Sequence, residues 1–365
     1  MLEAIAPGTF VMFGVAGILI YLAIAKEYEP ALLLPIGFGT LLGNLPHSPM
    51  NEPNGLLYIL NDFGVRTELF PLLIFIGIGA LMDFRPLLSQ PIFALMGAAG
   101  QLGIFATLIF ATALHFPLNQ AASIAIIGAI DGPTSIYVSS LLAPELLAPI
   151  AVTAYSYMSL VPIIQPPLMR LLTTKAERRI HMEYAPRPVS RGAIIAFPIV
   201  VTILVGLAVP QSAPLIATLM LGNLLKESGV VPRLSQAAAN EITNISTLFL
   251  GLVIGSLMQA GTFLRVQTLL ILALGLGAFM LDTIAGLLFG KVLAVLTRGK
   301  INPLVGAAGI SAFPMSGRLV QKIAQEEDFT NHVLMHAMGA NTAGQLGSVI
   351  AGGILLALVT SILGK

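Results

Sequence analysis

The chain has no cysteine, no tryptophan and few charged residues. Without cysteine it forms no disulfide and no thiolate metal site, and iron–sulfur clusters are excluded as well. Without tryptophan, any aromatic belt at a membrane surface must consist of tyrosine and phenylalanine. Only 10% of the 365 residues are charged, against roughly 25% in soluble domains. The net charge of +1 gives no basic footprint for nucleic acid, so we expect no nucleic-acid partner.

Apolar residues make up 56% of the chain and gather in long runs separated by Pro, Gly or polar residues. Because a membrane-spanning helix needs about 20 apolar residues, the runs predict an all-α polytopic protein with about ten or eleven transmembrane helices in the lipid bilayer. No Lys or Arg precedes the first apolar run, whereas a cleavable signal has a basic start. We therefore expect that run to be retained as a span.

Two apolar runs are interrupted in the middle, and the interruptions resemble each other. IIGAIDGPTS (126–135) aligns with LVGAAGISAF (304–313), and FIGIGALMDFRPLL (75–88) aligns with LVIGSLMQAGTFL (252–264). Paired broken helices are typical of transporters built from inverted repeats, whose sites lie near the bilayer midplane. The pattern thus predicts two repeats, of the inverted type, with their broken helices meeting there.

The most polar segment, 173–191, contains five Lys or Arg residues against two Glu residues. By the positive-inside rule it is cytoplasmic, and we interpret its charges as those of a solvated loop. The predicted organisation is as follows: N-terminal transmembrane helices in 1–60, a first repeat in 61–172 with a broken helix at 126–140, the basic loop 173–191, connecting transmembrane helices in 192–240, and a second repeat in 241–365 with a broken helix at 302–324.

Asp131 is an acid in the middle of the first interrupted run. Acids inside spans are rare and usually face a cavity, so each is a functional candidate. Thr134 and Ser135 add hydroxyls, and Gly132-Pro133 breaks the helix and frees backbone carbonyls. Carboxylate, hydroxyl and carbonyl oxygens are the ligands of a hard cation such as Na⁺. The alternative is a structural Asp that is protonated or hydrogen-bonded at a kink.

The second interrupted run, NPLVGAAGISAFPMSGR, has no acid at the matching position. It offers Asn302, Ser311 and the open backbone at Gly306 as oxygen ligands, and it carries Arg318. The Arg318 guanidinium suits a carboxylate, either that of Asp131 or that of an anionic substrate. It also fits an interfacial arginine that snorkels to water.

Other polar groups lie in spans further along the chain. The repeat places Tyr157 opposite Asn341, which makes Tyr157 a better functional candidate than Tyr155, interpreted as packing. Asn341 lies with Thr342 and Gln345 in a helix of small residues. These three groups suit a cation or, equally, hydrogen bonds between helices.

Asp282 is a second acid in an apolar run, for which structural pairing and a proton or ion role remain open. GLLFGKV (286–292) fails the spacing of a phosphate-binding loop, and no biotinyl-lysine motif of the Ala-Met-Lys-Met kind is present. Any pumping must therefore draw on an energy source other than ATP, and biotin would have to arrive on a partner.

Four segments in order resemble one family. The chain is similar to the beta subunits of sodium-pumping, biotin-dependent decarboxylases over roughly residues 60–363. In chain order, the four segments are TELFPLLIFIGIGALMDFRPLL, GAIDGPTSIYVSSLLAPELLAPIAVTAYSYMSLVPIIQPPLM, NPLVGAAGISAFPMSGRLVQK and HAMGANTAGQLGSVIAGG. The family comprises membrane subunits of oxaloacetate, methylmalonyl-CoA and glutaconyl-CoA decarboxylases. The resemblance implies a bacterial cell-membrane protein that decarboxylates carboxybiotin, consumes a proton and exports Na⁺.

The resemblance also implies partners and residue roles. Biotin carrier and carboxyltransferase subunits would present carboxybiotin, with a small single-span membrane subunit and further copies of this chain in the complex. The catalytic residues would be Asp131, Tyr157 and Arg318, with Arg318 and Ser311 toward carboxybiotin. The Na⁺ ligands would be drawn from a larger set: Asp131, Asn302, Gly306, Ser311, Asn341, Thr134 and Ser135, with Asp282 in second rank.

A different class of protein would show the same repeats and broken helices. A secondary carrier that couples Na⁺ to an organic anion would use Arg318 to bind the substrate carboxylate. Such a carrier would bind its anion unaided and would not react with carboxybiotin.

Overall fold

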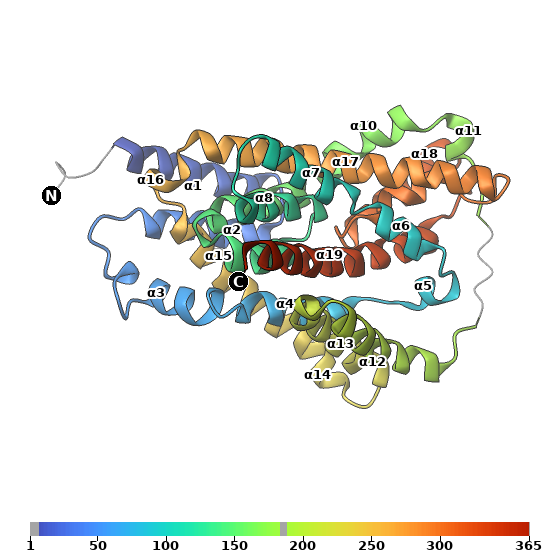
Figure 1. The fold of residues 1–365 in the computed structure, drawn as a ribbon, viewed down its shortest axis with the longest axis horizontal. Coiled ribbons are helices and arrows are strands. Elements are labelled where there is room, and N and C mark those ends of the chain that lie inside the picture. The colour runs from blue at the N-terminus through green and yellow to red at the C-terminus, as the bar shows by residue number, and fades with distance from the viewer. Residues whose placement is uncertain (1–6, 183–187, 365) are drawn as a thin grey trace.

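The computed structural model describes residues 7–182 and 188–364 (Figure 1). Every regular element within these ranges is a helix, as the composition predicts. Among the described residues, seven helices are long and apolar enough to cross a membrane: Pro7–Ala25, Phe93–Ala113, Pro144–Leu172, Arg191–Ala208, Pro232–Leu257, Val266–Leu296 and Leu334–Leu363. An eighth arises if Pro49–Val65 and Leu69–Leu81, bent by 61° against each other, form one span.

This number is below the ten or eleven spans predicted, because several apolar runs do not fold as full-length helices. Pro30–Gly43 and Leu118–Ala129 are apolar but too short to cross a bilayer alone. The interrupted runs 119–142 and 302–324 each fold as short pieces. The run 331–363 was long enough for two elements, yet it contains the single helix Leu334–Leu363.

Within residues 7–182 and 188–364, twelve longer helices contain most of the residues: α1 (Pro7–Ala25), α2 (Pro30–Gly43), α4 (Leu69–Leu81), α7 (Leu102–Ala113), α9 (Gly132–Leu142), α10 (Leu147–Leu172), α12 (Arg191–Ala208), α13 (Ala213–Ser228), α15 (Thr243–Leu257), α17 (Val266–Leu296), α18 (Met315–Glu327) and α19 (Leu334–Leu363). Short α-helices lie between them: α3 (Leu56–Leu60), α5 (Arg85–Ser89), α6 (Phe93–Ala99), α8 (Leu118–Ala125), α11 (Lys175–Arg178), α14 (Pro232–Ala237) and α16 (Ala260–Phe263).

Tighter and wider helical turns also occur in the described ranges. The 3₁₀-helices are η2 (Pro49–Asn51), η4 (Ile126–Ala129), η5 (Pro144–Leu146), η6 (Pro210–Ser212) and η8 (Pro303–Gly309). The π-helical turn η3 (Asn61–Val65) stands shortly before α4, and the π-helical turn η7 (Ala238–Ile242) stands directly before α15.

Glycines let pairs of helices approach closely. A Cβ atom on Gly39 of α2 would lie 2.2 Å from the Leu252 carbonyl oxygen of α15. A Cβ atom on Gly222 of α13 would lie 1.8 Å from the Ile76 carbonyl oxygen of α4. In a bilayer, where lipid is as apolar as leucine, such close contact between small residues is a main source of helix association.

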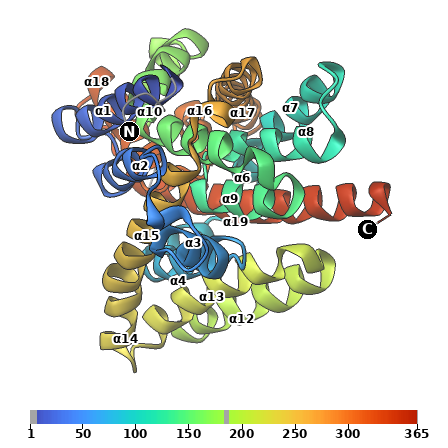
Figure 2. The same ribbon diagram turned by 90° about the vertical axis from the view of Figure 1, so that its left-hand side faces the viewer.

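The central and peripheral helices differ sharply in burial. Nine of the eleven residues of α9 are buried, including Thr134, Ser135 and Ser139. In α12, Pro198 is the one buried residue, so its apolar side chains face outward, as those of a lipid-facing helix do. Helix α9 packs against α10, α8, α19 and α4, and Figure 2 shows α12, α13 and α14 grouped along one side of the molecule.

The first interruption lies between η4 and α9. Ile130 has a φ of 53°, which is the left-handed region and is uncommon for a β-branched residue. Asp131 is extended, and α9 begins at Gly132 with Pro133 in its first turn, where the missing N–H removes no helix bond. A residue held in such a region costs about 1–3 kcal/mol and is typical of functional sites. The surrounding packing must therefore hold this break in place.

The second interruption separates η8 from α18 and touches the first. The backbone N–H of Ser311 donates to the carbonyl oxygen of Ala129 at 3.2 Å. The repeat in the sequence predicted that the two breaks meet, and this hydrogen bond joins them directly.

The last turn of α10 and the basic segment that follows it pack against the end of α18. Three pairs join them: Arg170 with Glu326 at 2.7 Å, Arg178 with Glu327 at 2.5 Å, and His181 with Asp328 at 2.8 Å. The Arg178 side chain is only 7% exposed and also donates to the Thr173 carbonyl oxygen. The interpretation of these charges as a solvated loop is therefore wrong for Arg178, which anchors α18. Residues 183–187 of the predicted loop lie outside the described residues.

These contacts shift the acidic groups of the junction. The hydrogen bond from the Arg178 guanidinium holds the pKa of Glu327 below its usual range. Hydrogen bonds from the Thr330 hydroxyl and from His181 lower the pKa of Asp328 to about 2. Both carboxylates therefore stay ionised at neutral pH.

Candidate functional site

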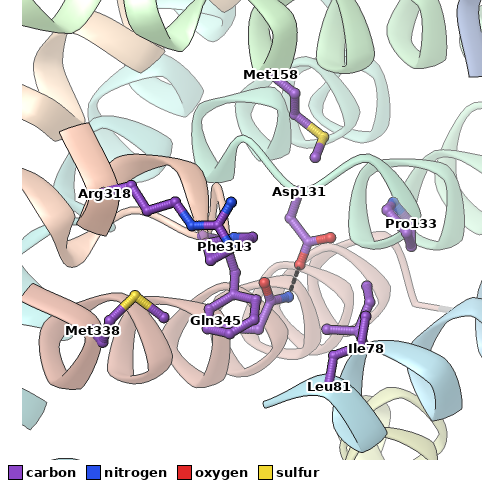
Figure 3. A pocket seen from close by; sticks show the side chains of 11 residues that line it. Ile78, Leu81, Asp131, Pro133, Met158, Phe313, Arg318, Met338 and Gln345 are labelled. Atoms are coloured by element: carbon purple, nitrogen blue, oxygen red, sulfur yellow. Dashed lines mark hydrogen bonds between the residues drawn. The ribbon is translucent and has the colours of Figure 1, made fainter. Parts of the chain in front are cut away.

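Asp131 is buried and caps the N-terminus of α9, with 3% of its surface exposed. Oδ1 accepts a hydrogen bond from the Thr134 N–H at 3.4 Å, and Oδ2 accepts one from the Thr134 hydroxyl at 2.7 Å. Two more donors reach Oδ2 from α19: Gln345 Nε2 at 2.5 Å, which Figure 3 shows, and Ser348 Oγ at 2.9 Å. Four donors thus compensate a carboxylate that is removed from water.

The local sequence explains why α19 supplies both donors. Gln345 and Ser348 are three residues apart, so they lie on one face of the helix. Small residues surround them on that face: a Cβ atom on Gly352 would lie 3.0 Å from Cγ2 of Thr134. Close approach of α19 to α9 therefore brings short polar side chains to the capped carboxylate.

A cavity of about 560 Å³ opens beside Asp131. The first turns of both half-helices face it, with Pro133 of α9 on one side and Pro314 and Arg318 around α18 on the other. Its polar lining residues are Asp131, Ser311, Arg318 and Gln345. Apolar residues form the remainder: Ile78, Leu81, Pro133, Met158, Phe313, Pro314 and Met338.

Arg318 projects into this cavity from α18 and points toward the side on which Asp131 lies (Figure 3). The residue is exposed, and among the described residues its side chain has no hydrogen bond or ion pair. It is therefore not the counter-charge of Asp131, whose carboxylate is occupied by neutral donors. An unpaired guanidinium in a cavity is suited to an anionic ligand.

Hydrogen bonds join the second break to α19. Ser311 Oγ donates to the Gly344 carbonyl oxygen at 3.0 Å, and Asn341 Nδ2 donates to the Ile310 carbonyl oxygen at 2.7 Å. The buried Oδ1 of Asn341 has no hydrogen-bond partner among the described residues. The structure thus brings Asn341 to the second break, with one amide oxygen left for a further ligand.

Asn302 and Gly306 do not line the cavity of Asp131. Asn302 caps η8 and donates to the carbonyl oxygens of Arg178 and Ile180 at 3.0 and 2.9 Å. Gly306 allows η8 to touch α17, since a Cβ atom there would lie 1.9 Å from the Gly286 carbonyl oxygen. These contacts assign both residues to the placement of the second broken segment.

The two tyrosines of α10 lie in different surroundings, and Tyr155 is the one nearer to Asp131. The Tyr157 hydroxyl donates to the Leu272 carbonyl oxygen of α17 at 2.6 Å, and Tyr157 does not line the cavity. The ring of Tyr155 lies against Gly132, where a Cβ atom would be 2.1 Å from Cε1. Tyr155, interpreted as packing, is thus the tyrosine that contacts the break beside Asp131.

Ser135 and Asp282 take different positions. Ser135 Oγ donates to the Asp131 carbonyl oxygen at 2.8 Å, within the first turn of α9. Asp282 of α17 is fully buried, accepts from the backbone N–H of Gly103, and does not line the cavity.

Sequence reasoning missed Ser348 and gave Gln345 only a secondary place. A detectable signal existed: polar residues three apart in an otherwise small and apolar helix mark one face. The partner of that face could not be found from the sequence, because Gln345 and Asp131 are 214 residues apart.

The arrangement combines two chemical capacities. Carboxylate and hydroxyl oxygens around Asp131 suit a hard cation such as Na⁺. The first turns of α9 and α18 carry partial positive charge, and together with Arg318 they favour an anion in the cavity. Groups suited to a cation and groups suited to an anion thus lie beside one cavity, which has the size usual for small ligands.

Comparison with known proteins is unambiguous. The family profile described as Na⁺-transporting oxaloacetate decarboxylase beta subunit matches residues 8–359. The methylmalonyl-CoA decarboxylase subunit beta of Propionigenium modestum is 50% identical, over 96% of this chain and 95% of that protein. The glutaconyl-CoA decarboxylase subunit beta of Acidaminococcus fermentans is 49% identical, over 96% of this chain and 93% of its own length. The oxaloacetate decarboxylase beta chain of Klebsiella pneumoniae is 44% identical, over 97% and 96%.

Proposed function

This chain belongs to the family of beta subunits of Na⁺-transporting decarboxylases, and from that premise we propose that Asp131 and Arg318 carry its chemistry. The chain is a multi-pass membrane protein that couples a decarboxylation to Na⁺ transport. The comparisons favour this function over that of a Na⁺-coupled carrier of organic anions. The observation that carries the proposal is the single cavity shared by a buried carboxylate and an unpaired guanidinium.

In the proposed site, Na⁺ is the transported substrate and binds at Asp131. The Asp131 carboxylate and the hydroxyl oxygens of Thr134 and Ser348 are its ligands, since they already converge on one point. Gln345 joins them by turning its amide so that the oxygen, rather than Nε2, faces the cation. Ser311 and Asn341 complete the set from the second break, through the hydroxyl and the free amide oxygen.

In the same proposal, the anion is the carboxyl group of carboxybiotin. Arg318 binds that carboxylate, assisted by the N-terminal turns of the two half-helices. The apolar wall formed by Ile78, Met158 and Phe313 receives the rings of biotin. Ser311 of the second break lines the same cavity, and its hydroxyl donates to the substrate when it turns away from the Gly344 carbonyl oxygen.

Decarboxylation and ion binding meet at Asp131. When the carbon–nitrogen bond of carboxybiotin breaks, the electron pair stays on the ureido nitrogen, CO₂ leaves, and the nitrogen takes up a proton. Asp131 holds either a proton or Na⁺, and a proton displaced by Na⁺ is released into the cavity that contains the reacting nitrogen. The same carboxyl group therefore links loss of CO₂ to loading of the ion.

The further members of the complex follow from the family. The biotin carrier and carboxyltransferase subunits bring carboxybiotin, which this chain has no biotinylation motif to hold itself. A small single-span subunit and further copies of the chain complete the assembly in a bacterial cell membrane. The segment 173–191 lies on the cytoplasmic side, from which carboxybiotin enters.

The helix order supports two repeats that extend beyond the predicted boundaries. The π-helical turn η3 precedes α4 as η7 precedes α15, and α2 packs on α15 as α13 packs on α4. The breaks after η4 and η8 then correspond, as do α10 and α19. In this proposal the repeats are of the inverted type, which is supported by the courses of two helices: α10 ends at one end of the long axis of the molecule, and α19 runs toward the other (Figure 1).

Two substitutions test the division of labour between cation and anion. Asp131→Asn keeps the shape of the site and removes the charge, so Na⁺ stimulation of decarboxylation should be lost. Arg318→Gln should raise KM for carboxybiotin by roughly tenfold or more, because a charge-assisted contact is removed, while the half-saturating Na⁺ concentration changes little. Purified protein in liposomes, given free carboxybiotin, provides both numbers.

Lys322→Gln is the matched control for the loss of positive charge on α18. Lys322 is exposed one turn after Arg318 and does not line the cavity. If Lys322→Gln raised KM as much as Arg318→Gln, the guanidinium would have no specific role. If Asp131→Asn kept full Na⁺-stimulated turnover, the cation site would lie elsewhere.

A further inference from the structure

Asp282 is a second buried acid, and the proposed function leaves it without a role. Its side chain is fully buried in α17, and no basic residue pairs with it among the described residues. One carboxyl oxygen, Oδ1, accepts from the backbone N–H of Gly103 and lies near that of Ile104. The other oxygen, Oδ2, has no hydrogen-bond partner in the described part of the chain. A buried acid with this arrangement requires an explanation.

The contact partner of Oδ1 is the first turn of α7. The helical conformation is interrupted between α6 and α7 at Gly100 and Gln101, and α7 begins at Leu102. Gly103 and Ile104 are the second and third residues of α7, whose N–H groups have no partner within the helix. Gln101, the residue at the N-cap position, makes no side-chain cap. Asp282 supplies from α17 the cap that α7 does not supply itself.

The contact partner of Oδ2 is the first broken segment. A Cβ atom on Gly128 of η4 would lie 2.9 Å from Oδ2, so the carboxyl group rests directly on this turn. Gly128 stands three residues before Asp131, just ahead of the left-handed Ile130. The carboxyl group of Asp282 thus lies between the start of α7 and the turn that leads into the proposed cation site.

Gln101 extends this contact to the second broken segment. Its Nε2 donates to the carbonyl oxygens of Gly309 and Gly344, each at 3.3 Å. Gly309 ends η8, and the carbonyl oxygen of Gly344, directly before Gln345, also accepts from the Ser311 hydroxyl. The turn that Asp282 caps therefore holds both breaks and the part of α19 that reaches Asp131.

We propose that Asp282 is a positioning residue: by capping α7 and supporting Gly128, it holds the two broken segments in the register that forms the Na⁺ site. The inference rests on the proposed function, because it takes Asp131 as the centre of that site. It requires the acceptor oxygen of Asp282 and not its charge. It therefore separates the two roles, structural and ionic, that the sequence left open for this acid.

Asp282→Asn and Asp282→Ala distinguish these roles. The amide oxygen of asparagine still accepts from the Gly103 N–H, so Asp282→Asn should keep an apparent Kd for Na⁺ within about threefold of the wild type. Asp282→Ala removes the cap and should raise that Kd by roughly tenfold. The Kd is read from the Na⁺-dependent rise in unfolding temperature of the detergent-solubilised chain, and independently from Na⁺-stimulated decarboxylation.

A pair of glycine variants tests the inference without touching the acid. Gly128→Ala places a methyl group against Oδ2 and should weaken Na⁺ binding in the same direction. Gly277→Ala, on α17, faces open space and should leave Na⁺ binding unchanged. These variants keep the test decisive if Asp282→Ala fails to fold.

Failure of this inference and failure of the proposed function give different results. If Asp282→Asn is as defective as Asp282→Ala, the charge or proton of Asp282 is needed and the positioning role is wrong. An unchanged Kd in Asp282→Ala or in Gly128→Ala overturns it as well. The proposed function fails separately, when Asp131→Asn binds Na⁺ as the wild type does.

Discussion

Removal of the Ser348 hydroxyl isolates one contact of the proposed cation site. Ser348 Oγ is 2.9 Å from Asp131 Oδ2 and also 2.9 Å from the Gln345 carbonyl oxygen, so one hydroxyl proton is shared between two acceptors. In the proposed Na⁺-bound state the hydroxyl oxygen faces the cation as a ligand, and a polar contact to a charged group contributes about 1.5–3 kcal/mol, less between membrane helices. A loss of about 1.4 kcal/mol corresponds to a tenfold change in affinity. Ser348→Ala should therefore raise half-saturating Na⁺ by roughly tenfold.

The assay is Na⁺-stimulated decarboxylation of free carboxybiotin, with Na⁺ titrated at saturating substrate. Ser139→Ala is the matched control, because Ser139 is equally buried but donates to the Ser135 and Ile136 carbonyl oxygens of its own helix. Its loss takes no donor or ligand from Asp131. Equal Na⁺ dependence of the two variants would refute the assignment of Ser348 to the site.

Three further predictions concern the packing around the site and the junction at α18. Gly132→Ala should reduce turnover at least tenfold, since its Cβ would lie 2.1 Å from a packed tyrosine ring, and a rate assay on the folded variant measures this. Glu327→Gln leaves the buried Arg178 without its charged partner. It should therefore lower the unfolding temperature more than Glu326→Gln, whose arginine partner is 52% exposed. Equal losses of unfolding temperature would contradict the role of Arg178 as the anchor of α18. Asp328 has a pKa lowered to about 2, so its contribution to stability is complete above pH 4 or so and is lost only as the pH falls toward 2. A denaturation series that showed this loss between pH 5 and 7 would contradict that sign.

The break beside Asp131 was predictable because its causes are local. Gly132 and Pro133 end any helix that approaches from the N-terminal side, and an acid in an apolar run requires donors. The direction of the half-helix was less accessible. Asp131 caps the N-terminal end of α9, and the sequence pattern did not predict which end of a half-helix would meet the carboxylate. The backbone conformation at Ile130 determines which helix end meets Asp131. Its left-handed φ could not be predicted from the sequence, because β-branched residues rarely adopt that region.

The family resemblance is confirmed. It indicated which residues to consider, but it did not predict which of them contact one another in the fold. Asn302 and Asp131 share a family pattern, yet Asn302 bonds to the backbone of the segment after α10. Tyr157 was preferred to Tyr155 from the repeat alignment, which records correspondence between halves and not contact with Asp131. Contacts of this kind depend on helix rotation and on pairs that are far apart in the sequence, which periodicity does not report.

The central claim is that one cavity couples decarboxylation to Na⁺ movement through Asp131. The most direct test follows release of CO₂ and uptake of radioactive sodium at the same time, in liposomes that contain purified wild-type protein or Asp131→Asn. The account predicts that carboxybiotin drives Na⁺ uptake in the wild type, that the two rates remain in constant proportion as Na⁺ is varied, and that Asp131→Asn loses both. Na⁺ uptake that persists in Asp131→Asn, or CO₂ release by the wild type without Na⁺ movement, would contradict it.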